Sequence, residues 1–142
     1  MKKKASAVWM GDLKTGKGII STETGVLSNA QYGFNSRFES GPGTNPEELI
    51  GAAHAGCFSM ALSAQLGNAN LKADKIETTA TVTMDKVDPA GWTVTEVLLE
   101  VKAKIPGATK EAFATAANAA KAGCPISRLL NAKISMNAEL EQ

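Results

Sequence analysis

Apolar and polar residues alternate with a period of two at three places near the start of the chain. Ala5, Ala7 and Trp9 fall on one side of the first run, and glycine-rich turn residues separate that run from the isoleucines that follow. A third run places two phenylalanines on the same side. Such alternation is typical of a strand with one buried face. The pattern therefore predicts strands at residues 5–10, 19–23 and 33–39.

A long helix is predicted to begin just after residue 45. Asn45 is a good N-cap, Pro46 suits the first helical position, and Glu48 stands at the capping-box spacing from Asn45. Residues 49–66 are nearly all apolar or small, and Gly-Asn at 67–68 is a stop signal. A helix without a polar face is normally buried. We therefore expect a sheet to cover one side of it and another element to cover the other side.

The second half of the chain predicts a long antiparallel hairpin, two helices and a last strand. Strand-like alternation occurs on both sides of the turn at 88–91. Thr109 is a suitable cap for an alanine-rich helix, and Pro125 suits the start of a short one. The chain is expected to form one α+β domain over residues 1–142. The elements are expected at 76–84, 92–104, 109–122, 125–130 and 134–140.

Charge and composition exclude several classes of protein. Fifteen Lys and Arg residues against fourteen Asp and Glu give a formal net charge of +1, so no electrostatic attraction to nucleic acid or to an anionic membrane is expected. The basic start is not followed by the apolar region of a signal peptide. No stretch is expected to approach the roughly 20 apolar residues of a membrane span. We expect a soluble, cytoplasmic protein without a cofactor.

The two cysteines, Cys57 and Cys124, carry the most unusual chemistry that this composition allows. In a reducing compartment, cysteines serve reactivity or metal binding more often than permanent disulfides. Cys57 lies in the middle of the apolar helix, beyond the reach of the helix dipole, and a merely buried thiol is an equally good interpretation. Cys124 is predicted to cap the helix at 125–130, a position that lowers a thiol pKa. Local sequence therefore makes Cys124 the more acidic thiol, with a plain capping role as the alternative.

His54 stands one helical turn before Cys57, near enough for contact between the side chains. The pair would suit a thiol hydrolase, or, together with Cys124, a zinc site. Zinc sites usually show paired short spacings, and cysteine hydrolases usually draw their histidine from a distant segment. Packing or a hydrogen bond is therefore the favoured interpretation of His54. Taken alone, Arg37 is a solvated charge and Glu47 a helix-start carboxylate.

The motifs around Arg37, Glu47, Cys57 and Cys124 are similar to those of a known family. Asn-Pro-Glu followed by Cys-Phe, and then Gly-Cys-Pro, resemble in order and separation the OsmC/Ohr family of organic hydroperoxide reductases. The similarity spans the whole chain. One departure is Gly56, where the family pattern leads us to expect alanine.

The resemblance implies a thiol-dependent peroxidase that reduces organic hydroperoxides to alcohols. By position, Cys57 matches the peroxidatic cysteine and Cys124 the resolving one, while Arg37 and Glu47 match the charged pair that supports the site. A sulfenic acid on Cys57 would condense with Cys124 to a disulfide, and an external dithiol, of lipoyl type in the family, would reduce it. The implied fold is an intertwined α+β homodimer with antiparallel sheets around long central helices. A partner chain would account for the helix that is apolar on all sides.

Helix geometry adds one inference about Glu47. On a straight helix it lies about 15 Å from Cys57 of the same chain, so Glu47 of a partner subunit is the simplest neighbour for that cysteine. Two other functions stay open: a non-enzymatic, stress-induced dimer whose cysteines merely pack, and a hydrolase using Cys57 and His54. Consumption of peroxide with a dithiol reductant discriminates among the three.

Overall fold

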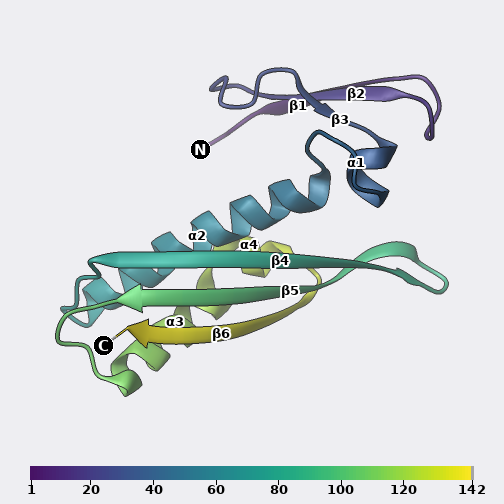
Figure 1. The fold of residues 1–142 in the computed structure, drawn as a ribbon. Coiled ribbons are helices and arrows are strands. Elements are labelled where there is room, and N and C mark those ends of the chain that lie inside the picture. The colour runs from purple at the N-terminus through teal and green to yellow at the C-terminus, as the bar shows by residue number, and fades with distance from the viewer. Residues whose placement is uncertain (142) are drawn as a thin grey trace. The chain divides into compact units, whose positions relative to one another are not determined.

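The computed structural model describes residues 1–141. The chain divides into two compact units, residues 1–49 and the residues from 50 onward. The long helix α2 (Pro46–Asn68) begins in the first unit and continues through the second (Figure 1). The single domain over residues 1–142 stays a prediction.

The first unit is a small antiparallel sheet followed by a short helix. Its strands are β1 (Ala5–Met10), β2 (Lys17–Thr22) and β3 (Ala30–Tyr32), in the order β1-β2-β3. The predicted strands at 5–10 and 19–23 are confirmed. Trp9 packs on Tyr32 with ring centroids 5.5 Å apart, across Gly18 of the central strand. A Cβ atom on Gly18 would meet both rings at under 3 Å, so this contact requires glycine.

The predicted strand at 33–39 is wrong, because this segment forms the helix α1 (Phe34–Phe38). The Ser36 hydroxyl accepts the Gly33 N–H at 2.9 Å and donates to the carbonyl oxygens of Gly33 and Thr44. Serine side chains commonly compete with the strand ladder in this way. Phe34 and Phe38, which alternation put on one strand face, also stand at the i,i+4 spacing, and their rings pack at 4.9 Å.

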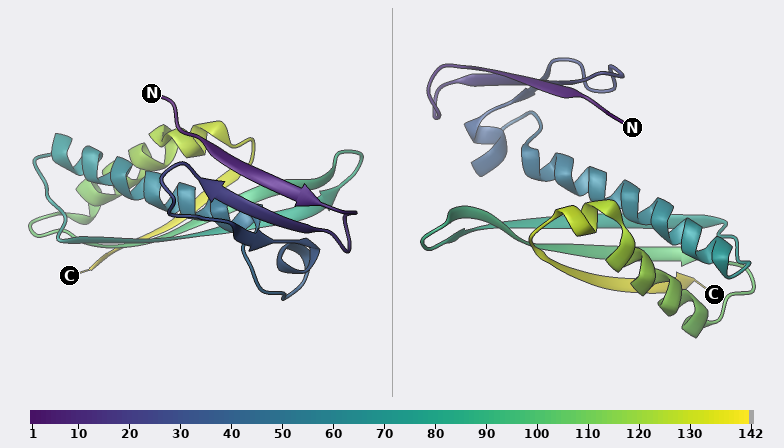
Figure 2. Two further views of the ribbon diagram at one scale, coloured as in Figure 1. Left: turned by 90° about the horizontal axis from the view of Figure 1, so that it is seen from above. Right: turned by 180° about the vertical axis from the view of Figure 1, so that it is seen from behind.

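The second unit is a three-stranded sheet with helices on one face. The strands are β4 (Lys75–Val87), β5 (Gly91–Lys104) and β6 (Lys133–Glu141), in the order β4-β5-β6. The hairpin of β4 and β5 is antiparallel, and β6 returns parallel to β5 after the helices α3 (Lys110–Gly123) and α4 (Pro125–Leu129). Helices α2 and α3 lie on the same face of this sheet (Figure 2). The predicted elements of the second half are confirmed.

The buried core of the described residues lies between these helices and the sheet. Helix α2 contributes Phe58, Leu62 and Leu66, each completely buried, at the four-residue spacing of one helix face. A Cβ atom on Gly51 would stand 3.2 Å from the Ala80 carbonyl oxygen, so helix and strand approach closely there. The remaining core side chains come from β5, α3 and the segments that follow them: Val97, Leu99, Val101, Ala103, Ile105, Phe113, Ala116, Ala117, Ala120 and Cys124.

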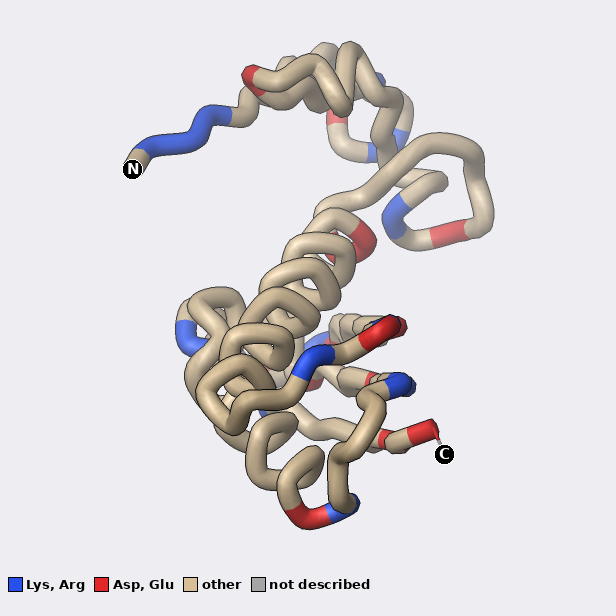
Figure 3. Tube along the Cα trace, turned by 90° about the vertical axis from the view of Figure 1, so that its left-hand side faces the viewer, with Lys and Arg blue, Asp and Glu red and all other residues tan. Residues whose placement is uncertain are grey.

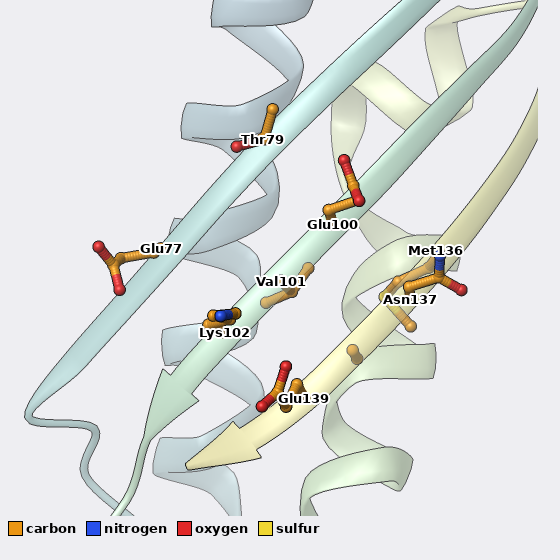
Figure 4. Close-up of a pocket in the computed structure, with 9 residues that line it drawn as sticks. Glu77, Thr79, Glu100, Val101, Lys102, Met136, Asn137 and Glu139 are labelled. Atoms are coloured by element: carbon orange, nitrogen blue, oxygen red, sulfur yellow. The ribbon is translucent and has the colours of Figure 1, made fainter.

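The outer face of this sheet is polar. Glu77, Lys102 and Glu139 stand opposite one another on the three strands, so charges of opposite sign alternate across the sheet. Their side chains point away from the helices and line a groove with Glu100 (Figure 4). Polar side chains on one face and core residues on the other are the ordinary division of a sheet that carries helices on one face only.

Helix α2 begins as the sequence predicts. The Asn45 side chain accepts the Glu48 N–H at 2.8 Å, which confirms the N-cap. The Glu48 carboxylate accepts the Thr44 hydroxyl at 2.8 Å in place of completing the capping box. Beyond the two glutamates of its first turn the helix carries no charge (Figure 3).

Only one side of α2 is covered in the described chain. Ala53, Gly56 and Met60 lie on an exposed side, and 77% of Met60 is accessible. The cover expected for this second side is therefore not supplied by residues 1–141. By length and composition α2 could also cross a membrane, contrary to our expectation that no segment would. Alanines among its leucines raise its hydropathy, and the core helix of a soluble protein passes the same test.

Candidate active site

The two cysteines meet in the second unit. Their sulfur atoms are 2.8 Å apart, although the residues are separated by 67 positions, and both thiols are free. Cys57 projects from α2 and is half-buried, whereas Cys124 is completely buried. Periodicity could not predict this contact, because it assigns each residue to an element but does not place α4 against α2. Only the family resemblance implied that the two cysteines react with each other. Two free thiols at this distance need to approach by less than 1 Å to reach the roughly 2.05 Å of a disulfide bond.

Cys124 is held by the junction of two helices. Its backbone N–H donates to the Ala120 carbonyl and ends α3, and its carbonyl accepts the Arg128 N–H in α4. The predicted N-cap position is confirmed. The thiol makes no hydrogen bond to the α4 backbone, however, and donates to the Cys57 sulfur instead. The capping position therefore serves to aim this side chain across to α2.

The surroundings of Cys57 disfavour its thiolate. Burial raises the pKa of the Cys57 thiol, and the adjacent Cys124 thiol raises it further, whereas a hydrogen bond from the Ile126 N–H lowers it. None of these influences comes from a cation. A normal thiol is already only a few per cent ionised at neutral pH. A reactive Cys57 therefore requires a positive charge from elsewhere.

Arg37 and Glu47 form an ion pair in the first unit. The Nε of Arg37 lies 3.2 Å from both carboxylate oxygens of Glu47, and Nη2 lies 2.8 Å from Oε1. This forked geometry is specific to arginine and fixes the plane of the guanidinium. The guanidinium carbon also stands 5.3 Å from the centre of the Phe38 ring. Glu47 is the more buried partner, with 14% of its side chain exposed against 37% for Arg37.

Two polar residues hold this pair in place. Ser36 donates to the Thr44 carbonyl at 2.8 Å, and its own carbonyl accepts the Asn45 amide at 3.0 Å. These bonds tie α1, which carries Arg37, to the start of α2, which carries Glu47. The role of Ser36 was not predicted, because an alternating run gives no sign of a hydrogen-bonded turn.

An aromatic pocket lies beside the guanidinium within the first unit. It has a volume of about 300 Å³. Apolar walls with one cationic group suit an organic molecule that carries a polar, oxygen-rich end. The pocket is lined by Trp9, Leu13, Tyr32, Gly33, Phe34, Arg37 and Phe38.

His54 is completely buried and bonded away from the cysteine. Its Nε2 lies 2.7 Å from the Ser127 hydroxyl oxygen on α4. Its Nδ1 is buried without a hydrogen-bond partner among the described residues. Burial lowers the pKa of the imidazole. This geometry supports a structural role for His54, and no sequence pattern pointed to Ser127 as its partner.

The third interpretation of His54 is a zinc site shared with the two cysteines. Within residues 1–141, no group of three or more His, Cys, Asp or Glu side chains could hold a metal ion.

The sequence matches known proteins over most of its length. The family described as OsmC-like protein matches residues 39–139. Peroxiredoxin OsmC of Escherichia coli strain K12 is 52% identical over 139 residues, which cover 98% of this chain and 96% of that protein. The organic hydroperoxide resistance protein OhrB of Bacillus subtilis is 31% identical over 124 residues, covering 87% of this chain and 89% of that one.

Solved structures share the fold. An OsmC-like protein from Vibrio cholerae, at 14% identity, has a TM-score of 0.78 and covers 97% of this chain and 99% of its own. The crystal structure of OhrB of Bacillus subtilis, at 25% identity, has a TM-score of 0.69 with coverage of 97% and 98%. The predicted α+β fold of OsmC/Ohr type is confirmed. With a family match over residues 39–139 and a relative 52% identical along nearly its whole length, this chain belongs to the OsmC-like protein family.

Proposed function

We propose that this protein is a thiol-dependent peroxidase that reduces organic hydroperoxides to alcohols. The observation that carries the proposal is the contact of Cys57 with Cys124, two free thiols from distant segments at 2.8 Å. A pair poised just short of bonding distance suits a catalytic disulfide that forms and opens in every cycle. The names of two relatives, a peroxiredoxin and an organic hydroperoxide resistance protein, support the same reaction class.

The cycle has three steps, and Cys57 begins it. Its thiolate attacks one peroxide oxygen, the O–O bond breaks, and the alkoxide leaves and takes a proton to become the alcohol. The Cys124 thiolate then attacks the sulfenic sulfur of Cys57, which forms the S–S bond and releases the sulfenic oxygen as water. An external dithiol, in the family of lipoyl type, finally reduces the disulfide by thiol exchange. In sum, a hydroperoxide and a dithiol give an alcohol, water and a disulfide.

Arg37 supplies the cation that Cys57 lacks. A guanidinium near the sulfur favours the thiolate and stabilises the negative charge that develops on the leaving oxygen. Glu47 holds the guanidinium in a fixed plane through the forked ion pair. Each tenfold gain in the thiolate fraction corresponds to about 1.4 kcal/mol.

The functional form is a homodimer in which Arg37 and Glu47 of one subunit serve Cys57 of the other. Helix α2 runs unbroken from Pro46 to Asn68, and ten residues of helix separate Glu47 from Cys57 by about 15 Å. The Arg37–Glu47 ion pair of a partner subunit is not held at this distance from Cys57 by the helix.

The burial of the first unit also supports a dimer. Among residues 1–49 only Gly18 and Ser36 are buried, so this unit has no large buried apolar side chain. Val8, Met10, Leu13 and Val26 are exposed in the single chain. A sheet normally buries one apolar face against another layer, and a second chain is the natural source of that layer.

The substrate is an organic hydroperoxide. The aromatic pocket beside Arg37 provides apolar contact for a carbon skeleton while the guanidinium faces oxygen. Apolar contact of this kind contributes on the order of 1–3 kcal/mol to discrimination. We therefore propose a higher kcat/KM for bulky organic hydroperoxides than for hydrogen peroxide. A cytoplasmic location fits the need for reduced thiols.

Single-turnover experiments with the two cysteine variants test the proposal. Cys57→Ser should not react with cumene hydroperoxide at all. Cys124→Ser should react once and leave a sulfenic acid on Cys57, which dimedone traps and excess peroxide over-oxidises. A reversed result would exchange the two roles. Peroxide consumption by neither the wild type nor the variants, with dihydrolipoamide present, would favour the non-enzymatic dimer, and ester hydrolysis by the wild type would favour the hydrolase.

A further inference from the structure

We infer that the hydrogen bond between His54 and Ser127 is a positioning contact that holds Cys124 within reach of the oxidised Cys57. The inference rests on the proposed peroxidase function and deepens it. It assigns a role in the disulfide-forming step to two residues that do not touch the peroxide.

Two side-chain contacts between α2 and α4 are arranged as a pair. His54 precedes Cys57 by three residues on α2, and Ser127 follows Cys124 by three residues on α4. Since residues three apart lie on one face of a helix, the Nε2-to-hydroxyl bond at 2.7 Å lies one turn from the sulfur contact at 2.8 Å. A shift or rotation of α4 against α2 would lengthen both contacts together.

Helix α4 needs such a contact, because little else in its own structure fixes it. It has five residues, and its ends are closed by two backbone bonds, from Arg128 to Cys124 and from Leu130 to Ile126. A single helical turn is not stable by itself. Ile126 and Leu130 pack on the core from one side, and the Ile126 N–H bonds to the Cys57 sulfur. Apolar packing does not specify position as sharply as a directional bond, so the bond from His54 to Ser127 adds a second directional restraint one turn away.

His54 favours one position of α4 for a second reason. The imidazole is completely buried, and its Nδ1 has no partner in the described chain. The Ser127 hydroxyl therefore provides the hydrogen bond of this ring, at Nε2. Movement of α4 away from α2 would leave both ring nitrogens buried without a partner, which is unfavourable. The buried His54 imidazole therefore favours the position of α4 in which Cys124 faces Cys57.

The His54–Ser127 contact should affect the second chemical step, which is disulfide formation. The Cys124 sulfur must reach the sulfenic sulfur of Cys57, form the S–S bond and expel the oxygen as water. The rate of such an intramolecular step depends steeply on how well the reacting atoms are held together. The first step, attack of Cys57 on peroxide, does not use Cys124. Loss of the positioning contact should therefore slow disulfide formation selectively and leave more sulfenic acid exposed to over-oxidation.

Ser127→Ala, which removes the hydroxyl, and Ser127→Thr, which keeps it, form the matched pair for the test. Each protein is reduced and mixed with cumene hydroperoxide, and the sulfenic acid and the disulfide are followed separately by dimedone trapping and mass spectrometry. We expect the rate of sulfenic acid formation to change by less than about twofold in both variants. Disulfide formation should fall at least tenfold in Ser127→Ala and stay near the wild-type rate in Ser127→Thr.

Variants at the other end of the bond provide an independent test. His54→Leu should reproduce the slow disulfide step, and His54→Gln, whose side-chain amide can still bond to Ser127, should restore it. Circular dichroism establishes that each protein is folded. Disulfide formation at the wild-type rate in folded Ser127→Ala or His54→Leu would overturn the inference while the peroxidase cycle stands. Absence of both a sulfenic acid and a disulfide in the peroxide-treated wild type would instead overturn the proposed function itself.

Discussion

At the scale of single residues, the arrangement of charge around Cys57 decides whether it can react. Burial and the Cys124 thiol both raise the pKa of Cys57, and the Ile126 N–H opposes them only in part. The thiol pair is therefore well arranged for disulfide exchange but poorly arranged for thiolate formation. In the proposed cycle, Arg37, oriented by Glu47 through a forked ion pair, supplies the positive charge that this chemistry requires.

Arg37→Lys tests the orientation of that charge. Lysine keeps the positive charge but cannot form the two parallel bonds to Glu47. We expect the second-order rate constant for organic hydroperoxide to fall on the order of tenfold or more, which corresponds to about 1.4 kcal/mol in the barrier. Arg128→Lys, at the exposed arginine of α4, is the matched control and should stay within about twofold of the wild type. Equal effects of the two substitutions, measured by stopped-flow kinetics, would remove the special role of Arg37.

His54 makes stability depend on pH in a defined direction. Burial lowers its pKa in the folded protein, whereas an imidazole in the unfolded chain titrates near 6.5. As the pH falls below about 6.5, the His54 imidazole takes up a proton in the unfolded state but stays neutral in the folded state. The free energy of unfolding therefore decreases. The decrease continues until the pH reaches the lowered pKa of the folded state. Its slope for one proton is at most about 1.4 kcal/mol per pH unit.

Urea unfolding between about pH 8 and pH 5.5 measures this effect at a fixed protein concentration. His54→Gln cannot take up the proton, and its unfolding free energy should decrease less over the same interval. Parallel pH profiles for the two proteins would show that His54 does not contribute to the acid sensitivity.

At the scale of elements, regular patterns and the cap of α2 were predictable, whereas the hydrogen bonds of Ser36 were not. The hairpin of β4 and β5, the cap at Asn45 and the start of the last strand follow from period, capping and turn residues. Helix α1 was missed because alternation and an i,i+4 phenylalanine pair coincide there, and the hydroxyl of Ser36 decides between them. The meeting of Cys57 with Cys124 depends on tertiary packing of α4, which leaves no trace in either local sequence.

Two glycines of α2 give opposite predictions for the same substitution. Gly51→Ala places a methyl group 3.2 Å from the Ala80 carbonyl oxygen, and crowding of about 1–3 kcal/mol there outweighs a gain in helix propensity of about 1 kcal/mol. Gly56→Ala meets nothing within 4 Å in the single chain, and the family pattern itself favours alanine. We expect Gly51→Ala to be less stable than the wild type and Gly56→Ala to be equally or more stable. Thermal unfolding of both variants makes the comparison, and a stabilised Gly51→Ala would contradict the close contact of helix and strand.

At the scale of the whole molecule, the two halves of the proposed site lie in different compact units of the chain. The thiol pair belongs to the unit from residue 50 onward, and the ion pair belongs to residues 1–49. The second unit buries a continuous core of its own, whereas the first unit buries none of its large apolar side chains. In the proposed dimer, each chain packs its first unit against the partner subunit. This packing would cover the apolar side chains of that unit and bring each ion pair to the thiols of the other subunit.

Mixed dimers of Cys57→Ser with Glu47→Ala test this arrangement. If each site takes its cysteines from one chain and its glutamate from the other, the mixed dimer has one site with both defects and one intact site. It should recover about half the peroxidase activity of the wild-type dimer, although both parent homodimers are impaired. Mixed dimers of Cys57→Ser with Cys124→Ser serve as the control, because these two cysteines meet within one chain. They should show no recovery, since each site lacks one thiol. Absence of recovery with Glu47→Ala would reject the shared site and leave the peroxidase proposal standing, because that proposal rests on the thiol pair alone.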